Sequence, residues 1–133
     1  MPAKILIVED DRPSARLLGY TLEKEGYQVL LATNGIEGLK KALEESPDLV
    51  VLDVMLPGLD GFEVCHRLKG RPATAGLPVL MLSAKAQESD LRTGEKVGAD
   101  RYLVKPVDPD FIVAAVESLL REHGPLPTTP SGQ

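Results

Sequence analysis

Residues 49–58 read Leu-Val-Val-Leu-Asp-Val-Met-Leu-Pro-Gly, and this stretch decides the fold. Four apolar residues run directly into Asp53, and a Pro-Gly turn follows at 57–58. A short, continuous apolar run rich in β-branched residues is typical of a strand buried on both faces of a parallel sheet. Such a strand has no place for a carboxylate along its length. We therefore place Asp53 at the carboxyl end of the strand, where open α/β sheets bind ligands, although an Asp that only initiates a turn is the plainer alternative.

The rest of the chain alternates between similar apolar runs and helical patterns. Strands are predicted over 5–8, 27–32, 49–52, 77–82 and 101–104. Helices are predicted from near Pro13 to Gly26, from Asn34 to Ser46, over 62–69, over 89–96 and after Asp108. Periodicity places two sets of residues toward the core: Leu39, Ala42 and Leu43 in the second helix, and Phe111, Ala114, Ala115 and Leu119 in the last one. Five such units with short loops predict a parallel sheet with helices on both faces and right-handed crossovers.

The composition is that of one ordinary globular domain. The chain has 133 residues, of which 43% are hydrophobic and 26% charged, enough for a single core. A net charge of −5 disfavours nonspecific nucleic-acid binding by this domain. The single cysteine, Cys65, excludes an internal disulfide framework and fits a reducing compartment, and no apolar run approaches the ~20 residues that span a bilayer. We expect a cytoplasmic protein without direct nucleic-acid or membrane contact, with a folded domain at 1–123 and a flexible tail or linker stub at 124–133.

Polar residues stand at the ends of four predicted strands: Glu9 and Asp10, Asp53, Ser83, and Lys105. In a parallel sheet they emerge at one edge. Three carboxylates brought together repel one another, and a divalent cation relieves that repulsion. Mg²⁺ prefers hard oxygen ligands and usually keeps waters and a substrate phosphate, while a hydroxyl and an ammonium suit phosphate oxygens. With no His or Cys nucleophile, zinc-ligand set or glycine-rich phosphate loop in this set, the nucleophile is the Asp53 carboxylate, and carboxylates do form aspartyl phosphates.

These residues and their neighbours resemble the receiver domain of bacterial two-component response regulators. The motifs that carry the resemblance are Glu9-Asp10, Asp53 with Pro57-Gly58, Ser83-Ala84, Gly98-Ala99-Asp100 and Lys105-Pro106. They agree with the family in residue type, order and spacing, and the resemblance covers about Lys4 to Arg121. It implies a flavodoxin-like, doubly wound (βα)5 fold with strand order 2-1-3-4-5.

The resemblance also implies a role for each site residue. Asp53 is expected to accept a phosphoryl group from a sensor histidine kinase or a histidine phosphotransfer protein, in a reaction that the domain catalyses only on itself. Mg²⁺, for which Mn²⁺ can substitute, is expected to bind Asp10, Asp53 and the backbone carbonyl of Met55, and Glu9 through water. Lys105 is expected to contact the phosphoryl oxygens, and the peptide bond that follows it to be cis, as X-Pro bonds can be.

A change of surface is expected to follow phosphorylation. The resemblance implies that Ser83 moves toward the new phosphate and that Tyr102 turns from an outward to an inward rotamer. This would reshape the surface of the fourth helix, fifth strand and fifth helix, which would control an output domain or target protein, or support a phosphorylation-dependent homodimer. Added charge of about −1.5 to −2 explains a movement on physical grounds, whereas the choice of Tyr102 rests on the resemblance alone.

Four other residues receive plainer interpretations. Asp11 is expected to cap or precede the first helix rather than bind metal, and Cys65 to be a small core residue. His66 has no ligand partners at metal spacing and is expected to be a solvated helix residue. His123 lies where the last helix frays and is expected to be inert.

Other functional classes share parts of this pattern. Phosphatases of the haloacid dehalogenase type also use a strand-end Asp, Mg²⁺ and a Lys, but they carry a second Asp two residues after the nucleophile, where this chain has Met55. A nucleotide- or flavin-binding module needs a glycine-rich first turn, and residues 9–12 are Glu-Asp-Asp-Arg. The complete set of acids argues against a receiver used only for docking. A stand-alone receiver and the receiver part of a larger regulator are both compatible with the sequence.

Overall fold

The computed structural model describes residues 2–123 and contains one parallel, five-stranded sheet. The strands are β1 (Lys4–Val8), β2 (Gln28–Ala32), β3 (Leu49–Leu52), β4 (Val79–Ser83) and β5 (Arg101–Val104). The helices are α1 (Arg12–Lys24), α2 (Gly35–Glu45), α3 (Gly61–Lys69), α4 (Glu88–Lys96) and α5 (Pro109–His123). The strand order β2-β1-β3-β4-β5, with every neighbouring pair parallel, confirms the predicted doubly wound fold.

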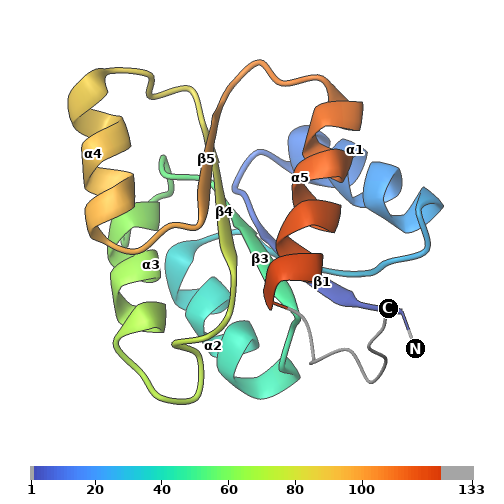
Figure 1. Ribbon diagram of the computed structural model, residues 1–133, viewed down its shortest axis with the longest axis horizontal. Coiled ribbons are helices and arrows are strands. Elements are labelled where there is room, and N and C mark those ends of the chain that lie inside the picture. Colours follow the sequence, from blue (N-terminus) through green and yellow to red (C-terminus); the bar gives the residue numbers. More distant parts are fainter. Residues whose placement is uncertain (1, 124–133) are drawn as a thin grey trace.

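The helices cover the sheet in two layers, as Figure 1 shows. Helices α1 and α5 pack on one face, and α2, α3 and α4 lie on the other. Because β1 and β3 lie in the middle of the sheet and are covered on both sides, residues 5–8 and 49–52 are at most 2% exposed. This burial explains why the central stretch is apolar until the chain leaves the sheet at Asp53.

Local sequence fixes the ends of the helices that surround the carboxyl edge. Asp11, Asn34 and Asp60 are the N-caps of α1, α2 and α3, and each side chain accepts a hydrogen bond from the backbone N–H three residues on. Asp11 therefore caps the first helix, as predicted. Gly61 starts α3 so close to the end of β3 that a Cβ there would lie 2.2 Å from the Asp53 carbonyl oxygen. Only glycine fits this approach.

Helix α5 buries a different stripe from the one predicted. Phe111 is 62% exposed and Ala114 is exposed, so the inward placement of both is wrong. The residues that face the core are Ile112, Ala115, Val116 and Leu119. The first two turns of α5 are apolar on nearly every side, so the periodicity of the sequence does not define the buried face.

Leu43 of α2 is also wrongly predicted, because it is 39% exposed. The helix approaches β1 at Gly38, where a Cβ would lie 2.8 Å from a methyl group of Val8. Leu43 is five positions further on and thus about 140° around the helix, away from that contact.

Smaller differences concern the ends of elements. Strands β2 and β4 begin one and two residues later than predicted, while β5 has the predicted bounds. The expected tail at 124–133 lies outside the described residues. Within residues 2–123, no helix combines the length and the apolar character that crossing a membrane requires.

Candidate functional site

The polar residues that were predicted to converge do emerge along one edge of the sheet. Backbone pairing sets their positions: the N–H of Asp53 donates to the Val8 carbonyl at 3.0 Å, and the N–H of Lys105 donates to the Ser83 carbonyl at 2.8 Å. Because the strands run parallel, the residues that follow their last pairs share the carboxyl edge. Glu9, Asp53 and Ser83 are at most 7% exposed there.

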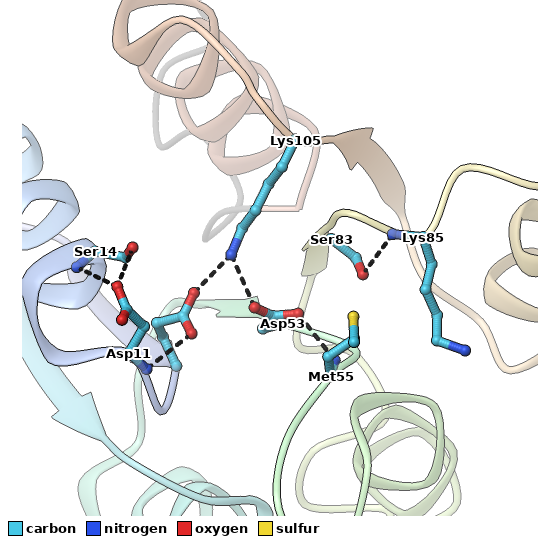
Figure 2. Close-up of polar contacts among 8 residues, drawn as sticks. Asp11, Ser14, Asp53, Met55, Ser83, Lys85 and Lys105 are labelled. Atoms are coloured by element: carbon cyan, nitrogen blue, oxygen red, sulfur yellow. Dashed lines mark hydrogen bonds and ion pairs between the residues drawn. The ribbon is translucent and has the colours of Figure 1, made fainter.

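Lys105 joins two carboxylates at the centre of this edge. Its Nζ donates to Glu9 Oε1 at 2.7 Å and to Asp53 Oδ2 at 2.8 Å. Figure 2 shows the Lys105 side chain reaching Asp53 from the segment between β5 and α5. The peptide bond between Lys105 and Pro106 is cis, which confirms that prediction.

Burial and ion pairing shift the pKa values of Glu9 and Lys105 in opposite directions. Burial raises the pKa of Glu9 above its usual value, its bonds to Lys105 and to the backbone of Asp11 oppose this, and the nearby charge of Asp53 adds to it. Burial alone would lower the pKa of Lys105, but its bonds to Asp53 and Glu9 outweigh that effect and raise it. Lys105 is therefore a firmly protonated cation between two poorly solvated acids.

The backbone of Lys85 links Ser83 to Tyr102. The N–H of Lys85 donates to Ser83 Oγ at 3.2 Å, and the Lys85 carbonyl accepts a hydrogen bond from the Tyr102 hydroxyl at 2.9 Å. The Tyr102 ring is half-buried and packs against the core between the sheet and α3. The two residues predicted to respond to phosphorylation are thus bonded to the same residue. No sequence pattern could show this link, because Lys85 contributes only its backbone N–H and carbonyl to it.

The acids that surround Asp53 are not equivalent. Glu9 lies at the centre, bonded to Lys105, whereas Asp10 is exposed at the rim. Asp11 turns away to bond the backbone and hydroxyl of Ser14, as Figure 2 shows. Asp53 itself accepts a second hydrogen bond, from the N–H of Met55 to Oδ1 at 2.9 Å.

A family model described as the response regulator receiver domain matches residues 5–117. This chain belongs to that family. Receiver domains are signalling domains of two-component systems, in which phosphorylation and control of an output are general properties. The resemblance read from the sequence is confirmed, and so is the fold that it implied.

Known receiver-containing proteins are similar to this receiver domain over most of its length. The alkaline phosphatase synthesis transcriptional regulatory protein PhoP of Bacillus subtilis (strain 168) is 49% identical over 121 residues, covering 91% of this chain and 50% of PhoP. The phosphate regulon transcriptional regulatory protein PhoB of Rhizobium meliloti (strain 1021) is 43% identical over 125 residues, covering 94% of this chain and 55% of PhoB. The chain spans about half the length of these curated relatives.

A solved structure supports the same assignment. The CheY-like response regulator receiver domain protein from Methanospirillum hungatei JF-1 matches with a TM-score of 0.86 and 32% identity, covering 92% of this chain and 97% of that one. The similarity therefore includes the whole sheet and both helical layers.

Receiver domains generally bind Mg²⁺ at the phosphorylation site, and the donors at this edge fit that ion. Asp53, Glu9 and Asp10 offer carboxylate oxygens, and Met55 offers a carbonyl, all of the hard type that Mg²⁺ prefers. In the part of the chain that the structure describes, no three His, Cys, Asp or Glu side chains are grouped as a ready cage for a metal ion. The expected convergence of three carboxylates is therefore only partial: Glu9 and Asp53 share Lys105, and Asp10 lies at the rim.

Two further residues lie where the sequence placed them. Cys65 is fully buried and its thiol donates to the Val97 carbonyl at 3.4 Å, so it is a core residue. His66 is exposed on α3. The side chain of His123 is outside the described part of the chain.

Proposed function

We propose that Asp53 is the phosphoacceptor of this receiver domain and takes its phosphoryl group from a sensor histidine kinase or a histidine phosphotransfer protein in the cytoplasm. The observation that carries the proposal is the 2.8 Å contact between Asp53 Oδ2 and the Lys105 ammonium at a strand end that is otherwise apolar. A buried carboxylate held beside a fixed cation is suited to a reaction that brings more negative charge to the same place.

The chemistry requires few groups. One carboxylate oxygen of Asp53 attacks the phosphorus of a phosphohistidine, the P–O bond forms as the P–N bond breaks, and the electron pair leaves with the imidazole. Lys105 stays within reach of the incoming phosphoryl oxygens, and the bond from the Met55 N–H orients the carboxylate. Mg²⁺ would be held by Asp10, Asp53 and the Met55 carbonyl, and by Glu9 through water, with Mn²⁺ able to substitute. When bound, the ion supplies positive charge for the phosphoryl oxygens.

The hydrogen bonds around Lys85 support a route from Asp53 to the surface. A phosphoryl group adds about −1.5 to −2 charge and new acceptor oxygens. The Ser83 hydroxyl is a donor for such an acceptor, and its movement would break the bond from the Lys85 N–H. Because Tyr102 is bonded to the carbonyl of the same residue, the switch would reach Tyr102 and the α4–β5–α5 surface.

A groove next to the site supports docking of the phosphodonor. It has a volume of about 470 Å³ and lies between α1 and the segment that joins β5 to α5. Leu17, Leu18, Val107 and Ile112 line it, together with Lys105 and Glu9 of the site. An apolar groove that shares Lys105 and Glu9 with the site fits a helix that presents a phosphohistidine.

Exposed apolar side chains also occur on the three elements that are expected to form the output surface. Leu91 of α4, Val104 of β5 and Phe111 of α5 are 38%, 37% and 62% exposed. We assign this surface to an output domain, a target protein or a phosphorylation-dependent second copy. The two curated relatives are transcriptional regulatory proteins about twice as long, which supports residues 1–123 as the receiver part of a longer regulator.

Intact-mass spectrometry after incubation with acetyl phosphate tests the proposal, with and without Mg²⁺, on wild type and Asp53→Asn. We expect one added phosphoryl group that requires Mg²⁺ and is absent from the variant. Asp53→Asn lowers the repulsion at the site, so the variant should fold. If wild type and Asp53→Asn both gained the mass of a phosphoryl group, the group would be on another residue. If wild type gained none from acetyl phosphate or from a panel of phosphorylated kinases, the domain would act only by docking to other proteins.

A further inference from the structure

Gly94 is a glycine in the interior of helix α4, where it is buried. Glycine is among the least favourable residues inside a helix, because its backbone loses the most freedom on folding. A glycine in this position calls for a packing reason.

The space beside Gly94 is filled by the ring of Tyr102. A Cβ on Gly94 would lie 2.7 Å from Tyr102 Cδ2 and 3.2 Å from Cε2, and 3.5 Å from the sulfur of Met81. The first of these distances is shorter than non-bonded carbon atoms tolerate. Any other residue at position 94 therefore requires the ring to leave or the helix to shift.

The far end of the same ring is fixed as well. The Tyr102 hydroxyl donates to the Lys85 carbonyl at 2.9 Å in the loop that precedes α4. On the strand side, Tyr102 pairs with Met81 of β4 in the register of the sheet. The ring thus reaches from β5, past Gly94, to the loop that also bonds Ser83.

We propose that Gly94 is a positioning residue that admits the Tyr102 ring to its place against α4 and so permits the bond between Tyr102 and Lys85. The role in signalling rests on the proposed function, while the steric role does not. With a side chain at position 94, the ring is excluded, the hydroxyl loses the Lys85 carbonyl, and Asp53 can be phosphorylated without moving Tyr102.

The chain contains a matched control. Gly19 is also a buried glycine inside a helix, α1. A Cβ there would meet its nearest neighbours, Val29 Cγ1 and Leu31 Cδ2, at 3.5 and 3.9 Å, which are ordinary contacts. Gly19→Ala therefore adds the same methyl group to a helix without the steric conflict.

The first test follows the ring directly. The chain has three tyrosines, so 3-fluorotyrosine gives three ¹⁹F signals, and Tyr102→Phe identifies the one of interest. Gly94→Ala should shift the Tyr102 signal toward that of a solvent-exposed fluorotyrosine, and Gly19→Ala should leave it in place. An unchanged Tyr102 signal in Gly94→Ala would overturn the proposal.

The second test measures coupling. We expect Gly94→Ala to lower the urea midpoint of the wild-type background more than that of the Tyr102→Ala background. In Tyr102→Ala the ring is absent, so a Cβ at position 94 no longer clashes with it. Equal changes in the two backgrounds would show that position 94 and the ring do not interact, and would overturn the proposal even if Gly94→Ala folded poorly.

The third test separates the inference from the proposed function. Acetyl phosphate with Mg²⁺ should add a phosphoryl group to wild type, Gly19→Ala and Gly94→Ala alike, but should shift the Tyr102 signal only in the first two. The same shift in Gly94→Ala would overturn the signalling role of Gly94. Failure to phosphorylate wild type both with acetyl phosphate and with a panel of phosphorylated kinases would overturn the proposed function and that signalling role together, while the steric role is decided by the unphosphorylated proteins.

Discussion

The Lys105 ammonium and the Glu9 carboxylate form an ion pair of 2.7 Å between residues 96 positions apart in the chain. The same ammonium lies 2.8 Å from Asp53, so one cation balances two acids that are nearly excluded from water. Two carboxylates this close would otherwise oppose each other's ionisation. The site therefore depends on positive charge for its stability as well as for its chemistry.

Lys105→Met should expose this dependence. Without the ammonium, two buried acids lose their partner, and we expect the free energy of unfolding to fall by about 1–3 kcal/mol in EDTA. If a divalent cation binds the same acids, millimolar Mg²⁺ should restore part of the loss, because a ligand of the folded state stabilises it. Urea unfolding in EDTA and in Mg²⁺ measures both effects.

Lys85→Met is the matched control for that change. The Lys85 ammonium is 3.9 Å from Asp90 and its side chain is 45% exposed, so the pair contributes little. We expect a change within about 0.5 kcal/mol. A Lys105→Met protein as stable as Lys85→Met in EDTA would contradict the role assigned to the Lys105 bridge.

Two adjacent aspartates should respond differently to removal. Asp10→Ala should weaken Mg²⁺ binding at least about tenfold, because it removes a carboxylate ligand. Asp11→Ala should lower the stability of α1 through loss of its N-cap, while Mg²⁺ affinity stays nearly unchanged. Isothermal titration with Mg²⁺ and thermal unfolding separate the two effects. Equal Mg²⁺ affinities for Asp10→Ala and wild type would remove Asp10 from the proposed ligands.

The fold was predictable because alternating strands and helices form a parallel sheet with helices on both faces. Once β3 is recognised as a strand buried on both faces, the alternation of elements requires a parallel sheet, and a parallel sheet brings Glu9, Asp53, Ser83 and Lys105 to one edge. The parallel direction of the strands is enough to place these four residues at the same edge, without any measured distance between them. The chemistry of the edge then follows from the types of side chain.

The errors and omissions arise where several arrangements satisfy the same pattern. Phe111 was misplaced because α5 begins with apolar residues on nearly every side, and the choice of face depends on how the helix packs on the sheet. The links through Lys85 are made by its backbone N–H and carbonyl, which nearly every residue type has. The space beside Gly94 exists because glycine lacks a Cβ. Such contacts leave little trace in a single sequence.

The pH dependence of stability should contain a contribution from Glu37 at the start of α2. Its carboxylate accepts a hydrogen bond from the Thr33 N–H at 2.7 Å, and this bond holds the pKa of Glu37 below its usual value. A lowered pKa means that the folded state binds its proton less tightly than the unfolded state. The stabilisation is therefore present above the unfolded pKa and is lost as the pH falls through the folded pKa.

Glu37→Gln tests this contribution, with Glu44→Gln on the exposed side of α2 as the control. Glu37→Gln should be less stable than wild type at pH 7, and the difference should shrink as the pH falls below about 4.5 toward the folded pKa. Urea midpoints measured from pH 7 down to the acid limit of folding follow the difference. A constant difference across that range would mean that the ionised carboxylate is not the cause.

The single thiol should report on opening of the core between the sheet and α3. Burial raises the pKa of Cys65 to about 11, so about one thousandth of it is thiolate at pH 8, and the thiolate is the reactive form. Native protein should react with a disulfide reagent far more slowly than protein in 8 M urea, and the native rate should rise with urea as the fraction unfolded does. Rapid labelling in buffer, at a rate that does not depend on urea, would mean that α3 moves away from the sheet without unfolding of the domain.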